Sequence, residues 1–182
     1  MTIKLIDGVA YTTDTDVFVS NRWIHDEING EAVGSLVHEA VHVVQQFKSG
    51  DAPGWLVEGT ADYVRWFKYE PQSHGADLRY MRHARKNFRY DGSYRITANF
   101  LNWVTEKYDK DIVTQLNAAM RAGKYDESLW KLYTGKTVRH LERNGKKTSK
   151  CSLSLARQHS QRGAVNVIIW QIQLCPTASR LA

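Results

Sequence analysis

The 182-residue chain has few of the residues that interrupt, cross-link or anchor a polypeptide. It contains three prolines and two cysteines, and both cysteines, Cys151 and Cys175, lie near the C-terminus. Residues 1–138 therefore hold no thiol that could form a disulfide or bind a metal. No apolar run approaches the roughly 18 residues of a membrane-spanning helix, and no signal-peptide pattern is visible. With 42% hydrophobic and 24% charged residues, the composition predicts one globular domain with a sizeable core.

The net charge of +6 is unevenly distributed along the chain. Residues 139–182 carry eight basic residues and one acid, Glu142, whereas residues 1–138 carry 17 basic and 18 acidic residues. The body of the protein is therefore not basic, which disfavours nucleic acid as its partner. Residues 139–182 lack a strong periodicity, and we expect them to form a basic, poorly ordered C-terminal tail.

The predicted elements separate the first 30 residues from the rest of the body. Residues 1–30 contain two short β-rich runs, Thr2–Ile6 and Asp16–Ser20. Residues 31–138 are predicted to be helical between loops rich in glycine and proline. The sequence therefore predicts an α+β fold that is mostly helical, with a small N-terminal β-sheet.

The most informative segment is His38-Glu39-Ala-Val-His42, which has the spacing H-E-x-x-H. On a helix, residues four apart lie one above the other, so both imidazoles can bind one metal ion. Glu39 is offset by about 100° from His38 and can lie beside a water on that metal rather than bind the metal itself. Zinc would lower the pKa of this water, and the carboxylate would take its proton during attack on a carbonyl group.

The alternative interpretation is that these are ordinary helix histidines, and their helical phase argues against it. His42 lies about 40° from His38, whereas the apolar residues of the segment fall between about 140° and 300°. Those apolar residues are Val33, Leu36, Val37, Ala40, Val41, Val43, Val44 and Phe47. Histidines of a core would lie among them, so the phase favours a metal site and predicts that the valine-rich side faces the core.

A second predicted helix, which follows a Gly/Pro loop, supplies acidic residues to the same region. Two histidines and a water leave zinc one protein ligand short, and Glu58 can be the third ligand. Asp62 lies one turn later on the same face and can accept the remaining N–H of a ligand histidine. Alone, these two acids would more often form a solvated face. Placed directly after H-E-x-x-H, they favour a metal site.

These motifs resemble those of the basic secretory protein family, zinc metallopeptidases of plants and bacteria. The resemblance covers about residues 3–138, three-quarters of the chain, with several motifs in the family's order. The matching segments are Asp7–Tyr11, the H-E-x-x-H helix with Val43-Val44-Gln45-Gln46, Glu58–Arg65, Tyr94–Leu101 and Leu132–Val138. The segment from Glu58 to Asp62 is also similar to that of the gluzincins, in which the glutamate is the third zinc ligand.

The resemblance implies a zincin-like metallopeptidase domain over residues 1–138, built around an active-site helix and one catalytic zinc ion. It implies His38, His42 and Glu58 as ligands and Glu39 as the general base. It further implies peptide or protein substrates and a secreted or extracytoplasmic location. Family members usually begin with a signal sequence and further structure before Asp7-Gly8, so a start this close to that motif is compatible with a truncated N-terminus.

A zinc peptidase also needs a hydrogen-bond donor for the oxyanion that develops on the substrate carbonyl, usually Tyr, His or Arg. Tyr94 is our first choice, and each candidate could instead be a packing or surface residue. The alternatives are Tyr63, Arg65, His74 and His83. The β-rich run Asp16–Ser20 is expected to be an edge strand beside the active-site helix, where it could pair with an extended peptide substrate.

The sequence thus favours a zinc-dependent peptidase and leaves two other functions open. One is a non-catalytic zinc-binding or interaction protein that keeps the metal site but lacks a working cleft. The other is a binder of acidic partners that acts through the basic tail, residues 139–182. No pattern in the sequence indicates an oligomeric state.

Overall fold

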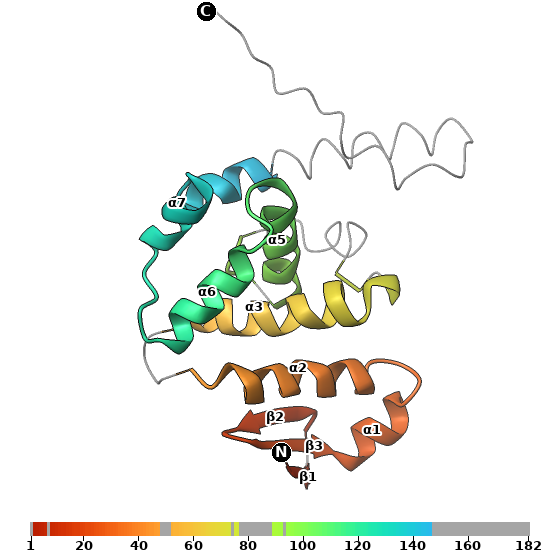
Figure 1. Cartoon of the computed structure of the whole chain (residues 1–182). Coiled ribbons are helices and arrows are strands. Elements are labelled where there is room, and N and C mark those ends of the chain that lie inside the picture. The colour runs from red at the N-terminus through yellow and green to blue at the C-terminus, as the bar shows by residue number, and fades with distance from the viewer. Residues whose placement is uncertain are drawn as a thin grey trace, which may run out of the picture.

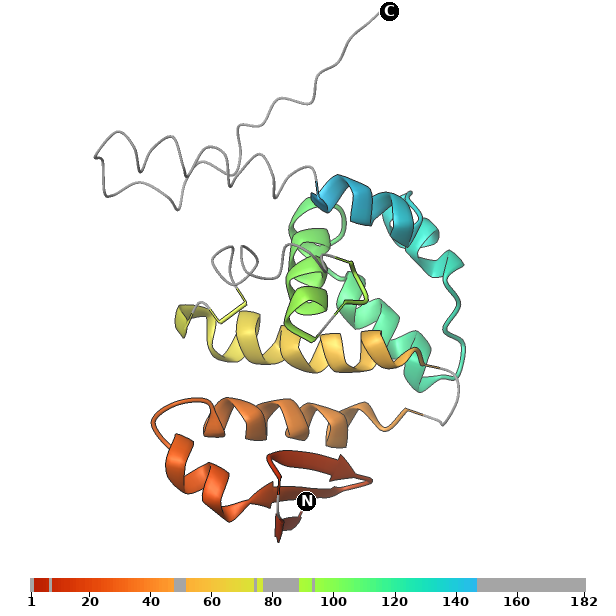
Figure 2. The same ribbon diagram turned by 180° about the vertical axis from the view of Figure 1, so that it is seen from behind.

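The computed structural model of the chain has two layers, which Figures 1 and 2 show from opposite sides. The first layer contains a small N-terminal sheet and helices α1 (Asn21–Glu27) and α2 (Ala32–Gln45). The second begins with helix α3 (Gly54–Val64) and contains the helices that follow it. The structure describes residues 2–6, 8–47, 52–73, 75–76, 89–92 and 94–146. The prediction of a mostly helical chain with a small N-terminal sheet is confirmed.

The sheet contains three strands, β1 (Thr2–Ile6), β2 (Ala10–Thr13) and β3 (Asp16–Ser20), in the order β1-β3-β2. β3 pairs with β1 in parallel and with β2 in antiparallel orientation. Both edges of β3 are therefore occupied, and the prediction that Asp16–Ser20 is an edge strand is wrong. Among the described strands, β2 forms the edge of the sheet on the side of the β2–β3 hairpin, and its outer edge is unpaired.

Two helices follow the sheet directly. Ser20 ends β3 and also caps α1 (Asn21–Glu27), because its hydroxyl oxygen accepts the Trp23 N–H at 3.2 Å. Helix α2 (Ala32–Gln45) then runs back across the sheet, and Gln46 ends it in the left-handed region with φ of 42°. The H-E-x-x-H segment lies in the middle of α2, as its spacing predicts.

The burial of α2 differs from the prediction that its valine-rich side faces the core. His38, Glu39 and Gln45 are buried, whereas Val33 and Val44 are exposed. The reason is that α3 (Gly54–Val64) lies alongside α2 in both views (Figures 1 and 2) and contacts its polar side, where Glu58 and Asp62 reach His38. The histidine face is therefore an interface between two helices rather than a surface opposite the core.

Helix α3 (Gly54–Val64) begins after Pro53, which has the extended backbone of an N-cap. It continues into a π-helical turn, η1 (Arg65–Tyr69), and a short 3-10 helix, η2 (Pro71–Ser73). One side of α3 faces α2, and the opposite side packs on α5, which stands across it in Figure 1. Glu58 and Asp62 lie on the side that faces α2.

The main hydrophobic core lies in the second layer, between α3, α5 (Tyr94–Lys107), α6 (Ile112–Arg121) and α7 (Ser128–Thr134). Its largest fully buried side chain is Trp130. The other members are Leu56, Tyr63, Ala98, Phe100, Leu101, Val104, Ile112, Leu116, Met120, Val138 and Leu141. This core fixes α3 and α5 relative to each other, and both helices contribute residues to the site described below.

The folded part of the chain extends past residue 138. Residues 138–146 are helical, and Leu141 is fully buried in the core. The remainder of the predicted basic tail, residues 147–182, lies outside the described residues. None of the helices in the described ranges combines the length and hydrophobicity that crossing a bilayer requires.

Gly59 allows α3 and α5 to approach closely. A methyl group at this position would overlap Cγ2 of Thr97 and lie 2.6 Å from its Cβ. Thr97 cannot easily move away, because it is buried and its hydroxyl donates to the Tyr90 carbonyl at 2.6 Å. Position 59 is therefore one at which any side chain overpacks the contact between the two helices.

We expect Gly59→Ala to lower the free energy of unfolding by about 1–3 kcal/mol, measured by urea denaturation. Gly54→Ala is the matched control, because no heavy atom beyond its chain neighbours and the adjacent backbone of its own helix lies within 4 Å of a methyl group at position 54. It should leave the stability unchanged or raise it by up to about 1 kcal/mol. Equal stabilities of the two variants would contradict the close packing of α3 on α5.

Candidate metal centre

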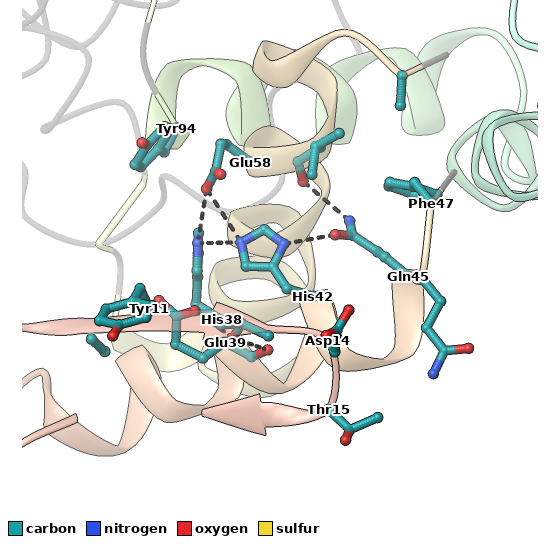
Figure 3. Close-up of a pocket in the computed structure, with 15 residues that line it drawn as sticks. Tyr11, Asp14, Thr15, His38, Glu39, His42, Gln45, Phe47, Glu58 and Tyr94 are labelled. Atoms are coloured by element: carbon teal, nitrogen blue, oxygen red, sulfur yellow. Dashed lines mark hydrogen bonds and ion pairs between the residues drawn. The ribbon is translucent and has the colours of Figure 1, made fainter. Parts of the chain in front are cut away.

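Three potential ligand atoms converge where α2 faces α3 (Figure 3). His38 Nε2 lies 3.1 Å from His42 Nε2 and 3.1 Å from Glu58 Oε2, and His42 Nε2 lies 3.3 Å from the same Glu58 oxygen. A zinc ion with bonds of about 2.0–2.1 Å in tetrahedral geometry requires ligand atoms about 3.3–3.4 Å apart. The three atoms thus form a triangle of nearly the required size, and these residues could hold one metal ion.

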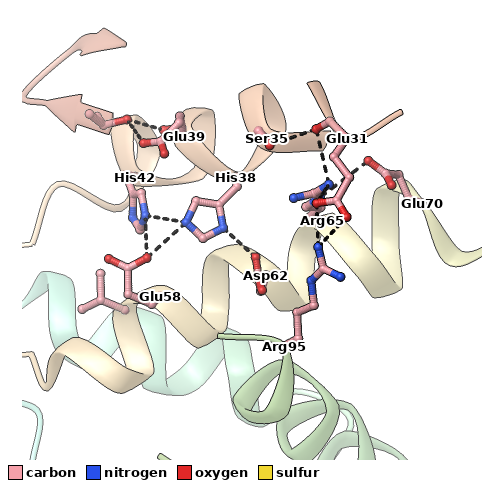
Figure 4. A network of polar contacts seen from close by, with 12 residues as sticks. Glu31, Ser35, His38, Glu39, His42, Glu58, Asp62, Arg65, Glu70 and Arg95 are labelled. Carbon is pink, nitrogen blue, oxygen red and sulfur yellow. Dashed lines mark hydrogen bonds and ion pairs between the residues drawn. The ribbon is translucent and has the colours of Figure 1, made fainter. Parts of the chain in front are cut away.

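Each histidine is oriented through its other ring nitrogen (Figures 3 and 4). His38 Nδ1 lies 2.7 Å from Asp62 Oδ1, and His42 Nδ1 lies 2.7 Å from Gln45 Oε1. An ionised carboxylate and an amide oxygen only accept hydrogen bonds, so each Nδ1 carries the proton. Both Nε2 atoms then face the centre of the triangle, where each can offer a lone pair to a metal ion once it has lost its proton.

Gln45 is part of the site although sequence reasoning did not single it out. It is buried, and its Nε2 donates to the Val57 carbonyl of α3 at 3.1 Å. Because the Gln45 nitrogen makes this bond, it is the Gln45 oxygen, Oε1, that faces His42. Its place three residues after His42 on one helix is the signal that could have identified it.

The charges of the triangle reinforce each other in the metal-free protein. Burial alone would lower the pKa of His38, but hydrogen bonds to Asp62 and Glu58 outweigh it and raise the pKa to about 9. Burial alone would raise the pKa of Glu58, but hydrogen bonds to both histidines lower it to about 2. The pocket therefore attracts positive charge, and a metal ion must displace a proton to enter.

Glu39 lies next to the ligands but takes no part in the triangle. It is buried, and its Oε2 accepts a hydrogen bond of 2.7 Å from the Thr12 hydroxyl of strand β2. The same hydroxyl lies 3.0 Å from the backbone carbonyl oxygen of Glu39. The structure thus keeps Glu39 separate from the ligand set, as its helical phase predicts.

Tyr94 begins α5 and lies beside the ligands (Figure 3). Its ring centroid is 6.0 Å from that of His38. The negative charge of Glu58, followed by partial burial, raises the pKa of Tyr94. Its hydroxyl therefore stays protonated at neutral pH and can donate a hydrogen bond.

Two of the alternatives to Tyr94 are described by the structure, and neither is as well placed. Tyr63 is buried in the hydrophobic core. Arg65 is buried and paired with Glu31 and Glu70. His74 and His83 lie outside the described residues.

Two cavities flank the candidate metal centre. One has a volume of about 800 Å³ and the other of about 460 Å³. His38, Glu39 and Tyr94 line both, so they stand on the boundary between them. Strand β2 begins at this boundary: Ala10, its first residue, lines both cavities, Tyr11 and Thr12 line the larger, and Val9, which precedes the strand, lines the smaller.

An ionic network connects the start of α2 to the start of α5 (Figure 4). Arg95 Nη2 lies 2.8 and 2.6 Å from the two carboxylate oxygens of Glu31, and Arg65 Nη2 lies 3.4 Å from one of them. The Trp66 ring lies against both guanidinium groups. Its centroid is 4.0 Å from Cζ of Arg65 and 4.4 Å from Cζ of Arg95. Because Arg95 follows Tyr94 directly, this network holds Tyr94 near the ligands.

Comparison with known proteins places most of the chain in one family model. Residues 1–144 match the model called BSP, which is described as a peptidase of plants and bacteria. The match includes every residue of the candidate metal centre. No significant match was found among curated proteins or among solved structures.

If the three residues hold a metal ion, we expect Asp62→Ala to weaken its binding by about 10–100-fold, tested with zinc, because the substitution removes the acceptor that orients His38. The affinity can be measured by competition with a chromophoric chelator. Asp14→Asn is the matched control, since Asp14 lines the same cavity from the turn between β2 and β3. Removal of a charge there should leave the affinity within about threefold of wild type. An unchanged affinity in Asp62→Ala would show that Asp62 does not support the ligand.

A second prediction concerns the Glu31 network. Burial alone would raise the pKa of Glu31, but the hydrogen bond and charge of Arg95, together with Arg65, lower it below its ordinary value of 4.5. Its stabilising contribution is therefore present above pH 4.5 and is lost as the pH falls through the lowered pKa.

We accordingly expect Glu31→Gln to have a lower free energy of unfolding than wild type at pH 7. This difference, the stability gap, should narrow below pH 4.5. Urea denaturation at several pH values measures this gap. Glu106→Gln is the control, because the Glu106 carboxylate on α5 accepts a hydrogen bond from the uncharged Asn102 side chain; at pH 7 it should lose less stability than Glu31→Gln. A gap in Glu31→Gln that does not change with pH would rule out the ion pairs as its cause.

Proposed function

We propose, for a chain that belongs to the BSP family of plant and bacterial peptidases, that it hydrolyses peptide bonds with one zinc ion as its cofactor. The observation that carries the proposal is the triangle of His38 Nε2, His42 Nε2 and Glu58 Oε2, with sides of 3.1–3.3 Å. Two imidazoles and one carboxylate, with further room in a cavity, are the ligand set of catalytic zinc sites.

In this proposal each residue of the site has its own role in hydrolysis. Bound zinc would polarise the scissile carbonyl group and lower the pKa of a bound water. Glu39 accepts the proton of the attacking water and delivers it to the nitrogen of the leaving amine. Asp62 and Gln45 keep the two histidines in the required tautomer and orientation. Tyr94 donates a hydrogen bond to the oxygen that becomes negative as the water attacks.

The substrate is a peptide in extended conformation that lies along β2. The described part of the chain leaves the outer edge of this strand unpaired, the strand lines the larger cavity, and its first residue, Ala10, also lines the smaller. A peptide paired with Ala10 to Thr12 would place residues on both sides of Glu39. Such a groove accepts internal bonds of a chain rather than only its ends. A secreted or extracytoplasmic location, which the family resemblance implies, belongs to the same proposal.

We expect Glu39→Gln to lower the rate of peptide hydrolysis by about 10²–10⁴-fold while zinc binding stays near wild type. The amide has nearly the same shape as the carboxylate but cannot accept the proton. The measurements are metal analysis and a chelator-reversible cleavage assay on a denatured protein. Full activity in a zinc-loaded Glu39→Gln protein would refute the role of Glu39 as general base.

The same assay separates the two alternative functions. Stoichiometric zinc without cleavage of any peptide in a library would favour a non-catalytic zinc-binding protein. Binding of acidic partners that disappears with salt and on removal of residues 147–182 would favour the basic tail as the functional part.

A further inference from the structure

The hydrogen bond between Thr12 and Glu39 joins the edge strand to the proposed general base. Along β2, Ala10 and Thr12 are half-buried, whereas Tyr11 and Thr13 are exposed. Thr12 therefore projects toward α2, where its hydroxyl lies 2.7 Å from Glu39 Oε2 and 3.0 Å from the Glu39 backbone carbonyl oxygen. Both contacts are with Glu39, the residue of α2 to which the proposed function assigns proton transfer.

The chemistry of the two contacts determines which one dominates. A hydroxyl group carries one proton, so it cannot donate fully to both oxygens. The bond to the carboxylate is shorter and has a charged acceptor, and such bonds are stronger than bonds between neutral groups. Thr12 therefore engages Oε2 and leaves Oε1 for the attacking water.

The position of Thr12 is itself well fixed. It is paired in the hairpin with Val17 of the central strand β3, and Val17 is fully buried. A side chain on so constrained a backbone can hold a carboxylate in one rotamer, whereas a free glutamate side chain has several. Glu39 also stands on the boundary between the two cavities, where the scissile bond of an extended peptide would lie.

From these contacts we infer that Thr12 is a positioning residue for Glu39. Its hydroxyl holds Oε2, so that Oε1 takes the proton of the attacking water and passes it to the leaving amine, while Thr12 keeps its own proton. The inference rests on the proposed function in its catalytic consequence. The hydrogen bond itself, and its effect on the Glu39 carboxylate, do not depend on that function.

The test compares Thr12→Val, Thr12→Ser and the matched control Thr13→Val, which makes the same change on the exposed side of β2. We expect Thr12→Val to lower kcat about 10–100-fold, since a misplaced catalytic group costs rates of this order. KM and the dissociation constant of zinc should stay within about twofold of wild type. Thr12→Ser restores the hydroxyl and should recover most of kcat, and Thr13→Val should resemble wild type.

A second measurement tests the contact without peptidase activity. The carboxyl ¹³C NMR signal of Glu39 can be identified by its loss in Glu39→Gln, in the metal-free and the zinc-loaded protein. It should shift in Thr12→Val and remain in place in Thr12→Ser and Thr13→Val. An unshifted signal in Thr12→Val would overturn the inference whether or not the protein cleaves peptides.

The remaining outcomes separate the inference from the proposed function. A wild-type kcat in Thr12→Val overturns the positioning role. A lower kcat overturns it as well if zinc binding weakens, or the free energy of unfolding falls, enough to account for the loss. A wild-type protein that cleaves no peptide refutes the proposed function, and the NMR signal then decides the contact alone.

Discussion

The arrangement of this protein depends on the contact between the polar faces of α2 and α3. Burying histidines and carboxylates costs free energy unless each polar atom has a partner. Here His38 and His42 each use one ring nitrogen toward Asp62 or Gln45 and the other toward Glu58. The opposite charges hold two helices at the separation that one cation needs. The sheet on one side and the core helices on the other keep this contact in place.

Much of the candidate site could be predicted because it is local in sequence. A spacing of four on a helix places His38 and His42 one above the other whatever surrounds them. Few residues separate α2 from α3 in the sequence, so Glu58 and Asp62 can reach the same place, and the structure brings these residues together. Their catalytic and ligand roles remain predictions. Periodicity and turn residues likewise predicted the helical body and two strands of the small sheet, but not β2 (Ala10–Thr13).

The features that could not be predicted depend on which elements become neighbours. Alternation of side chains identifies a strand but not its partners, so Asp16–Ser20 was expected at an edge and lies in the centre. The contact of Thr12 with Glu39 joins residues 27 positions apart and follows no period. Helical phase separated the apolar and polar sides of α2 correctly, but it could not show that α3 covers the polar side.

The composition of β2 has a consequence for the behaviour of the protein at high concentration. Natural sheets usually protect an open edge from self-association with charged residues or proline. Strand β2 reads Ala-Tyr-Thr-Thr and contains neither. If this edge binds an extended peptide as proposed, it can also pair with the same strand of a second copy, and the four residues of β2 limit how strong such an edge-to-edge dimer would be. Dilution would then favour the free groove, and crowded conditions would block it.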